Sequence, residues 1–405
     1  MTTREVWVTG VGAVTAAGIG AEALFELVFS GRTAVGRLDD LGGQWGARAP
    51  TPSIGRAGRR LDRSALLLVA AAEEAWADAR LARDSFDPRR TDVIEGSSLG
   101  CFGELLAAHR EQLAGHASAL DRPSALTRYM LGAGSARFAE VHGIRGRVLH
   151  LSAGSVSATC AIAEGFERIE CGRADIVVAG GGECALQRDV VRIFDTAGLL
   201  AGAEDEVPCR PFDEGRHGTV LGEGAGVLVL ESAEHARARG KGPRAVILGA
   251  GVTCEAYAMT APDPAGSGVV DAVRAALAGY PDAYESVGWI KTHGTGTRLN
   301  DAAEWRGLSS LFGGRLAEIP LTSLKPAIGH CLGASGAVEA VAAVLALEWG
   351  LIPPTIGTSR IDPELPPCRV ALRTTLMSRS LALLLSESFG GRCAALAMRR
   401  ASAFN

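Results

Sequence analysis

A short apolar run that leads into a Gly-x-Gly segment occurs twice in this chain, and the repetition limits the folds that the chain can adopt. Val6–Thr9 leads into Gly10–Gly12, and Ala245–Leu248 leads into Gly249–Gly251. Each pair is typical of a strand followed by a glycine-rich turn. Two such openings, one near the start of the chain and one past its middle, indicate an internally duplicated α/β chain.

The segments around these openings carry helical and strand patterns. Those with the helical apolar period are Ser64–Ala79, Leu105–Leu113, Ala133–Val141, Ala158–Glu170, Gly268–Leu277 and Gly336–Trp349. Two continuous apolar runs, Asp175–Ala179 and Ala225–Leu230, predict strands that are buried on both faces. No linker of disordered composition divides the chain.

Composition excludes several classes of protein. The chain has 405 residues, 47% of them hydrophobic, which is enough for a sizeable core. A formal net charge of -4 gives no reason to expect a nucleic-acid partner. No run of 18 residues is free of charge and no signal-peptide pattern follows Met1, so we expect no membrane span and a cytoplasmic protein. Nine cysteines without CxxC or CxxH spacing predict reduced thiols and no metal site.

One turn of small residues is a candidate position for a nucleophile. Val148–Leu151 has the pattern of a buried strand, Ser152–Ser155 follow as a tight turn, and a helical pattern comes next. This arrangement places Ser155 at a helix N-terminus, where backbone N–H groups favour negative charge. The alternative is that Ser155 or Ser152 only caps the helix.

Three further segments combine polar side chains with glycine. His293–Thr297 follows a strand pattern, Val287–Thr292, and could hold an accessible histidine beside two threonine hydroxyls. Lys325–His330 brings two basic groups together before a small-residue helix, and Ser386–Gly391 is predicted to be a tight, mobile loop between strands. Taken singly, the first two also fit an ordinary turn and a surface loop.

Two other segments are assigned no specific chemistry. Gly10–Gly12 lacks the third glycine of a dinucleotide fingerprint because position 15 is Thr15, so it is read as a turn. The arginine-rich stretch Arg56–Arg63 is read as a solvated surface loop, with a docking patch for an acidic carrier protein as the alternative.

Together the motifs resemble the β-ketoacyl synthases, the condensing enzymes of type II fatty-acid and polyketide systems. The likeness covers essentially the whole chain and keeps the family's order. The matching segments are Val8–Gly12, Arg210–Asp213 with Gly222–Gly226, His293–Thr297 with Asn300 and Asp301, and Lys325–His330 with Gly333 and Gly336.

The resemblance implies an α/β thiolase fold, with two similar halves packed as a five-layer α-β-α-β-α sandwich. Residues 1–243 would form the half with the nucleophile, and residues 244–405 the half with two histidines. It also implies acyl chains carried on the phosphopantetheine arm of acyl carrier protein, with no bound cofactor. The chain would form a homodimer or a heterodimer with a paralogous ketosynthase, without a membrane or nucleic-acid partner.

The resemblance implies roles for individual residues of this chain. Ser155 falls where the family keeps its nucleophilic cysteine, whereas Cys160 would lie inside the following helix and is rejected. The other matches are His293 and His330 as catalytic histidines, Lys325 as the lysine that orders the site, Glu339 as a buried supporting acid, Thr295 and Thr297 as pantetheine contacts, and Phe389 as the gate. The backbone N–H groups of Ser155 and Phe389 would form the oxyanion hole.

The chain also departs from the family pattern near this site. Ser388 replaces the first glycine of the usual Gly-Phe-Gly-Gly loop, with Glu387 before it, and the substitution is expected to stiffen the gate. Cys393 replaces an asparagine, and His217 stands where an aspartate is common.

Serine in place of cysteine changes the expected chemistry. A serine hydroxyl must lose its proton to a base as it attacks, and either histidine could accept it. An oxygen ester is a poorer acyl donor to a carbanion than a thioester is. We therefore expect an acyltransferase that passes acyl groups to an alcohol, an amine or water, or a modified condensing enzyme.

Three alternatives remain at this point. One is a non-catalytic subunit that resembles a chain-length factor and pairs with a ketosynthase, although the intact His293, Lys325 and His330 argue against it. Another is a Cys-to-Ser form of a decarboxylative synthase, although the residues beside Ser155 are altered too. The last is a thiolase that acts on coenzyme A esters, which the histidine motifs resemble less.

Overall fold

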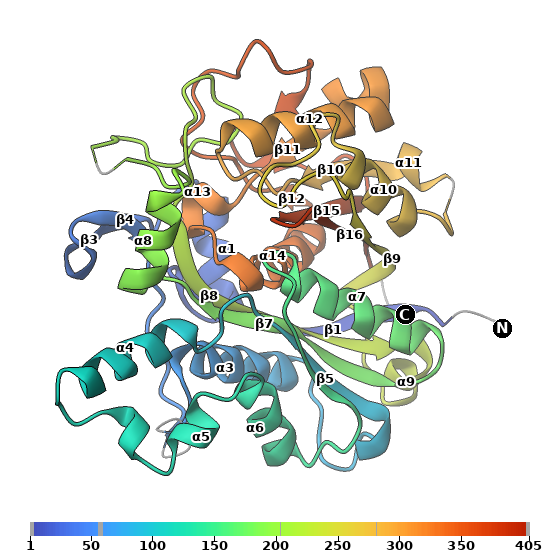
Figure 1. Ribbon diagram of the computed structural model, residues 1–405. Helices are drawn as coiled ribbons and strands as arrows, with labels where there is room; N and C mark the ends of the chain where they lie inside the picture. Colours follow the sequence, from blue (N-terminus) through green and yellow to red (C-terminus); the bar gives the residue numbers. More distant parts are fainter. Residues whose placement is uncertain (1–3, 56–59, 203, 281, 402–405) are drawn as a thin grey trace.

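The computed structural model describes residues 4–55, 60–202, 204–280 and 282–401. Two mixed sheets lie on either side of a central helical layer, and further helices cover the outer face of each sheet (Figure 1). The central strands of the first sheet are, in spatial order, β6 (Val148–Leu151), β5 (Thr91–Gly96), β7 (Ile176–Cys184), β8 (Leu221–Ser232) and β1 (Val6–Thr15). Those of the second are β11 (Pro320–Thr322), β10 (Val287–Lys291), β15 (Leu381–Ser388), β16 (Arg392–Arg400) and β9 (Ala245–Cys254).

The two sheets repeat one topology. Numbered by their order along each half, the strands run 3-2-4-5-1 in both. In each sheet strand 2 is parallel to strands 3 and 4, and strands 4, 5 and 1 are successively antiparallel. The sheets join along one edge, where Val6–Val8 of β1 pair with Ala245–Ile247 of β9. The topology confirms the predicted duplication, and the division at residue 243 stays a prediction.

Helices complete five layers. The central layer holds α7 (Ser157–Glu170) and α14 (Ser335–Trp349), the first sheet is covered by α3 (Arg63–Asp78) and α6 (Ala133–His142), and the second by α10 (Ser267–Ala276) and α12 (Arg298–Phe312). Separate apolar cores fill the central layer and the outer face of each sheet. The predicted five-layer thiolase sandwich is confirmed.

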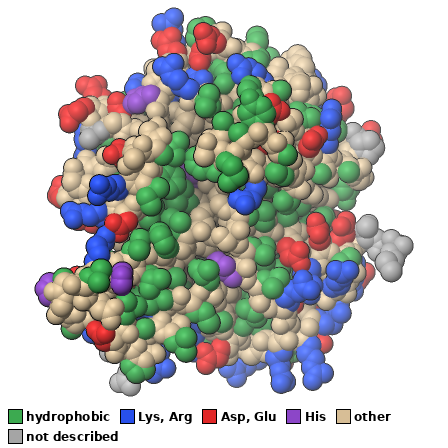
Figure 2. Space-filling model, in the orientation of Figure 1, with side chains coloured by type: hydrophobic (Ala, Val, Ile, Leu, Met, Phe, Trp, Pro, Cys, Tyr) green, Lys and Arg blue, Asp and Glu red, His purple; other side chains and the backbone are tan. Residues whose placement is uncertain are grey.

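The remaining helices and strands lie outside this layered scheme. They are α1 (Ala21–Phe29), α4 (Phe102–Leu113), α5 (Ala125–Arg128), α8 (Arg188–Thr196), α9 (Ala233–Ala238), α11 (Ala283–Ser286), α13 (Lys325–Ile328), β2 (Gly18–Ile19), β3 (Gly36–Leu38), β4 (Gln44–Ala47), β12 (Leu351–Ile352), β13 (Arg369–Val370) and β14 (Thr375–Leu376). On the face drawn in Figure 2, charged side chains lie mainly around the edge, and the middle is mostly uncharged.

The two Gly-x-Gly segments are not turns, which corrects the sequence interpretation. Both lie inside long strands, β1 and β9. A Cβ at Gly10 or Gly12 would overlap backbone atoms of α3, and one at Gly249 or Gly251 would overlap backbone atoms of α10. Glycine is therefore needed for the close approach of a helix to a strand, and each half uses the same device.

Other expectations need smaller corrections. β6 is an edge strand, with Val148 38% exposed, instead of a buried one. Lys325–His330 is buried and includes the short helix α13, so it is not a surface loop. Ser386–Ser388 belong to β15, which leaves only a tight turn before β16.

The arginine-rich stretch is only partly described, because residues 56–59 lie outside the described part of the chain. Its last member, Arg63, begins α3 and forms an ion pair of 2.8 Å with the buried Glu223, so it is not part of a solvated loop. By length and composition, Leu332–Trp349 could also cross a membrane, but 89% of this segment is buried inside the fold.

Candidate active site

Ser155 lies at the elbow between β6 and α7. Gly154 before it adopts a left-handed conformation with φ of 67°. The Ser157 hydroxyl donates to the carbonyl of Gly154 at 2.6 Å and accepts from the N–H of Ala153 at 2.8 Å, which fixes the turn. The Ser155 side chain makes no cap hydrogen bond to α7. Its hydroxyl instead lies 3.1 Å from His330 Nε2, so the capping alternative is wrong for Ser155.

His330 is placed to take a proton from Ser155. Its Nδ1 lies 2.9 Å from the Ser335 hydroxyl at the start of α14. When Nδ1–H donates to Ser335, Nε2 is left as an acceptor toward Ser155. Burial, followed by the charge of Lys325, holds the pKa of His330 well below its usual value. The ring is therefore neutral at physiological pH, as a general base must be.

His293 is fixed mainly through its backbone. Its N–H and that of Gly294 donate to the Glu304 carboxylate at 2.5 and 2.9 Å, and Lys325 donates to its carbonyl oxygen. The rings of His293 and His330 lie 5.4 Å apart at nearly right angles. Burial and the charge of Lys325 hold the pKa of His293 well below its usual value, so this ring is also neutral.

A buried ion network lies beneath the histidines. Lys325 Nζ is 3.0 Å from Glu339, and Lys291 Nζ donates to the other oxygen of the same carboxylate. Lys291 also donates to the carbonyl of Leu385 at 2.6 Å, at the inner end of β15. Because both lysines share Glu339, the network ties α14 to the strands that carry the site. Lys325 and Glu339 thus lie where the sequence placed them, and Lys291 is an addition.

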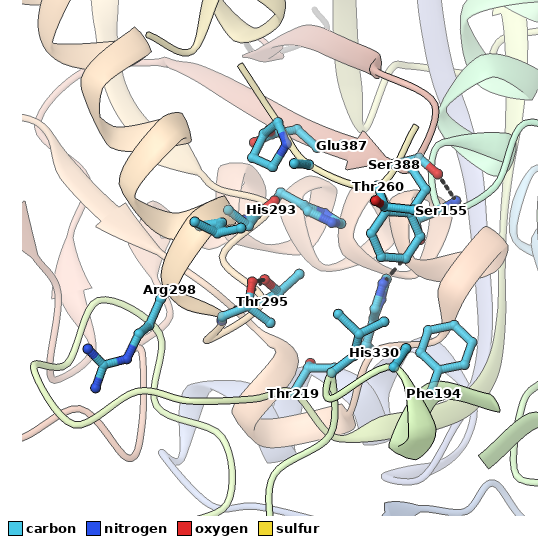
Figure 3. Close-up of a pocket in the computed structure, with 18 of the residues that line it drawn as sticks. Ser155, Phe194, Thr219, Thr260, His293, Thr295, Arg298, His330, Glu387 and Ser388 are labelled. Carbon is cyan, nitrogen blue, oxygen red and sulfur yellow. Dashed lines mark hydrogen bonds between the residues drawn. The ribbon is translucent and has the colours of Figure 1, made fainter. Parts of the chain in front are cut away.

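A cavity of about 670 Å³ opens above these groups (Figure 3). Ser155, His293, His330, Thr295, Thr297 and Phe389 all line it, so the residues predicted to contact substrate come together from both halves of the chain. The hydroxyls of Thr295 and Thr297 lie 2.9 Å apart, and Phe389 is 48% exposed at the mouth.

The Ser388 hydroxyl occupies the position toward which the Ser155 N–H points. That N–H donates to Ser388 Oγ at 2.9 Å. A Cβ at Gly154 would overlap the same hydroxyl, so the two positions are sterically linked. The sequence predicted a stiffer gate at Ser388. It did not reveal that the predicted oxyanion donor already has a hydrogen-bond partner here.

Cys160 is no rival nucleophile. It lies within α7, and burial raises the pKa of its thiol to about 11, so little thiolate exists at neutral pH. His217 lines the cavity, and its Nε2 lies 2.6 Å from Asp205.

Several residues of the site could not be predicted from the sequence, or only in part. Ser335 follows His330 by five residues and belongs to no recognisable motif. Glu304 lies in α12, whose apolar residues show no clear helical period. Lys291 was hidden inside an apolar strand pattern. In the sequence, Glu387 and Cys393 stand out only as departures from the family pattern, yet both line the cavity.

The fold and the cavity define the class of protein: a two-half thiolase-type scaffold with a serine-bearing turn from one half facing two histidines from the other. Family models for the N-terminal and C-terminal domains of β-ketoacyl synthases match residues 3–236 and 244–359. The chain belongs to the β-ketoacyl synthase family.

Individual relatives agree with this assignment. Nodulation protein E of Rhizobium sp. (strain N33) is 34% identical over 98% of this chain and 99% of its own length. The ishigamide ketosynthase/chain length factor structure has a TM-score of 0.89 at 29% identity, covering 99% of this chain and 100% of that one. A type II polyketide ketosynthase bound to a hexaketide, in complex with its acyl carrier protein (AntDE:AntF), has a TM-score of 0.88 at 27% identity, covering 99% and 100%.

Proposed function

We propose that the chain is an acyltransferase of polyketide-type biosynthesis that uses Ser155 as its nucleophile. The observation that carries the proposal is the distance of 3.1 Å between Ser155 Oγ and Nε2 of His330, a histidine that burial keeps neutral. A serine is a competent nucleophile only with a base in contact, and this geometry supplies one.

The reaction has two balanced steps. In the first, Ser155 Oγ attacks the carbonyl carbon of a pantetheine thioester, its proton passes to His330, and the C–S bond breaks to leave an ester on Ser155 and a protonated thiol. In the second, an acceptor hydroxyl, amine or water attacks the ester carbonyl and loses its proton to a histidine. Ser155 then leaves and regains its proton, which completes the cycle.

The developing oxyanion would be held by the N–H groups of Ser155 and Phe389. Because Ser388 now accepts from the Ser155 N–H, the substrate oxygen has to displace that hydroxyl. The exchange replaces one hydrogen bond by another, so the hydroxyl would act as a stand-in for the substrate oxygen before acylation. Lys325 and Glu339 would position His293 without touching substrate.

Acyl carrier protein is the proposed source of the acyl chain. The related ketosynthase in the AntDE:AntF structure binds its carrier protein, and Thr295 and Thr297 stand in the cavity where they could contact a pantetheine amide. A dimer, with a second copy or a paralogous ketosynthase, is supported by the edge strand β6 and by exposed apolar side chains nearby, Leu126, Met130 and Leu131. We place the protein in the cytoplasm.

We favour acyl transfer over condensation because of the leaving group. Transfer from a serine ester to an alcohol is nearly balanced in energy and transfer to an amine runs downhill, whereas a thioester is the stronger donor to a carbanion. The complete His293–Lys325–His330 cluster also speaks against a purely non-catalytic subunit, which would have no use for a neutral base in contact with a hydroxyl.

Intact-protein mass spectrometry tests the proposal. The purified chain is incubated with acyl carrier proteins that bear acyl groups of several lengths, beside Ser155→Ala and, as a matched control for another serine of the same turn, Ser152→Ala. An acyl mass on the wild type and on Ser152→Ala, absent from Ser155→Ala, supports the nucleophile. No adduct with any donor, even after rapid quenching, contradicts it.

A further inference from the structure

One wall of the cavity is acidic, and none of the chemistry proposed above uses it. Glu387 and Glu255 both line the cavity. Glu387 is on β15, directly before Ser388, and pairs across the hairpin with Cys393 of β16, which lines the same wall. Glu255 follows β9, and one of its oxygens accepts from the N–H of Asp263 at 3.0 Å. Figure 3 shows Glu387, His293 and Ser155 around the same cavity.

Glu387 differs from the other buried acids around the site because one oxygen is unsatisfied. It is only 6% exposed, and its Oε1 has no hydrogen-bond partner among the described residues. Glu304, by contrast, accepts from two backbone N–H groups, and Glu339 from two lysines. A buried polar atom without a partner is costly, because it has lost water without gaining a replacement. Because Glu387 lines the cavity, a ligand bound there could supply its carboxylate with the missing partner.

The charges around Glu387 indicate the sign of that ligand. Burial raises the pKa of Glu387 well above its usual value, and the neighbouring carboxylates Glu304, Glu255 and Asp301 raise it further. Lys325 acts in the opposite direction. Since the neighbours that act most strongly on Glu387 are three acids and one lysine, a negative group on the substrate would be repelled from this wall. A positive group would be attracted, and would allow Glu387 to ionise.

A bound metal ion fits this wall poorly. No group of three His, Cys, Asp or Glu side chains able to hold a metal occurs among the residues that the structure describes. The Cys393 thiol beside Glu387 is kept protonated, since burial and the charges of Glu387 and Glu255 raise its pKa. An organic cation needs only one carboxylate contact and a roomy cavity, and both are present.

We propose that Glu387, with Glu255 beside it, forms a subsite that receives a primary ammonium group of the substrate. This proposal rests on the proposed function in one respect: both take this cavity as the place where acyl chains on pantetheine bind. It identifies acyl chains that carry an amine as the substrates of this protein. The Glu387 carboxylate would accept a hydrogen bond from the ammonium group, and the carboxyl would release its proton to the solvent as the cation enters.

A binding experiment tests the subsite without requiring turnover. The probes are pantetheine amides of ω-aminoacyl chains of three to six carbons, each beside the matched chain that ends in methyl. An amide replaces the thioester, so no acyl transfer takes place, and titration calorimetry on Ser155→Ala keeps the result independent of the nucleophile. At pH 7 we expect at least one ammonium probe to bind about 10-fold tighter than its methyl partner.

The same titrations are repeated with Glu387→Gln added, with Glu22→Gln on the exposed surface of α1 as the matched control. The preference should disappear in Glu387→Gln, with the methyl probe bound as before, and should persist in Glu22→Gln. Equal binding of ammonium and methyl probes at every length, or a preference that survives Glu387→Gln, overturns the proposal.

Proton release provides a second test that needs no variant at this position. Calorimetry in buffers of different ionisation enthalpy should show net proton release when an ammonium probe binds at pH 7, and none when the methyl probe binds. Absence of proton release overturns the assignment to Glu387, even if ammonium probes bind tightly. Failure of the proposed function would appear separately, as a missing acyl mass on Ser155.

Discussion

The floor and the wall of the cavity are built in opposite ways. The floor is the network of Lys291, Lys325 and Glu339, which lies beneath the histidines that line the cavity and in which buried charges are paired and hydrogen bonded. The wall carries Glu387, with an unpartnered oxygen, and Ser388, whose hydroxyl accepts from the Ser155 N–H, a donor of the proposed oxyanion hole. Fully satisfied groups fix geometry, whereas groups that still lack their final partner are the ones that respond to a ligand.

If the floor is structural, removal of its shared carboxylate should have the largest effect on the protein. Glu339→Gln leaves two buried lysines without a counter-charge, and breaking a buried pair in this way costs about 3–5 kcal/mol. Urea unfolding of the variant should show a much lower midpoint. Glu140→Gln, which removes a surface ion pair with Arg137 at 2.7 Å, should change the free energy of unfolding by less than about 0.5 kcal/mol. Similar losses of unfolding free energy in both variants would contradict a structural role of the floor.

Removal of the base should slow acylation without unfolding the protein. His330→Ala should lower the rate of Ser155 acylation by about 10²–10⁴-fold. Stopped-flow or quenched-flow mass measurements with one acyl carrier donor give that rate directly. Ser335→Ala should show a smaller loss, because it removes only the hydrogen bond that orients the ring. A normal rate in His330→Ala would exclude it as the base.

The pH dependence of acylation follows from the neutral histidines. Since the pKa values of His330 and His293 are held well below 6.5, the base form persists as the pH falls through the ordinary histidine range. The acylation rate should therefore stay nearly constant from pH 8 to about pH 6 and fall only at lower pH. A midpoint at or above 6.5 would show that the rings are more exposed to solvent than the structure indicates.

Removal of the Ser388 side chain should increase the rate of acylation. Ser388→Gly frees the Ser155 N–H for the substrate oxygen, and a hydrogen bond of net value about 0.5–1.5 kcal/mol no longer has to be exchanged. Acylation should become roughly 2- to 10-fold faster, measured in the same quenched-flow assay. A slower reaction would mean that the Ser388 hydroxyl takes part in catalysis.

The smallest effect concerns stability. The folded-state pKa of Glu387 is raised above its unfolded value, so its contribution to stability is present below about pH 4.5 and is lost as the pH rises toward the folded pKa. Glu387→Gln removes this dependence. Its melting temperature should exceed that of the wild type by about 1–3 °C at pH 8, with the difference vanishing near pH 4. Scanning calorimetry at a series of pH values measures the trend.

The sequence predicted the fold well, and the roles of the site residues stay predictions. The duplicated openings and ordered motifs led to a two-half α/β sandwich, and Ser155, His293 and His330 meet in one cavity. The positions of these residues followed from the resemblance to the β-ketoacyl synthases; Ser155 and His293 come after the strands β6 and β10, whereas His330 comes after the short helix α13.

What the sequence could not show was the contacts between segments that lie far apart along the chain. The glycines of β1 were read as a turn because a close helix approach and a turn need the same residue type. Ser388 and Glu387 looked like local changes in a loop. Their meaning depends on Gly154, Glu304 and Glu255, which lie on other elements. Partners of this kind emerge only from tertiary structure.

The central claim is that Ser155 makes this protein transfer acyl groups instead of condensing them, and the fate of the isolated acyl-enzyme tests it most directly. Wild type and Ser155→Cys are acylated from the same carrier protein, freed of donor, and mixed in parallel with malonyl-carrier protein and with amine, alcohol or water acceptors. We expect the wild type to form ester, amide or acid and at least about 10-fold less β-ketoacyl product than Ser155→Cys. Equal β-ketoacyl formation by the two proteins would contradict the claim.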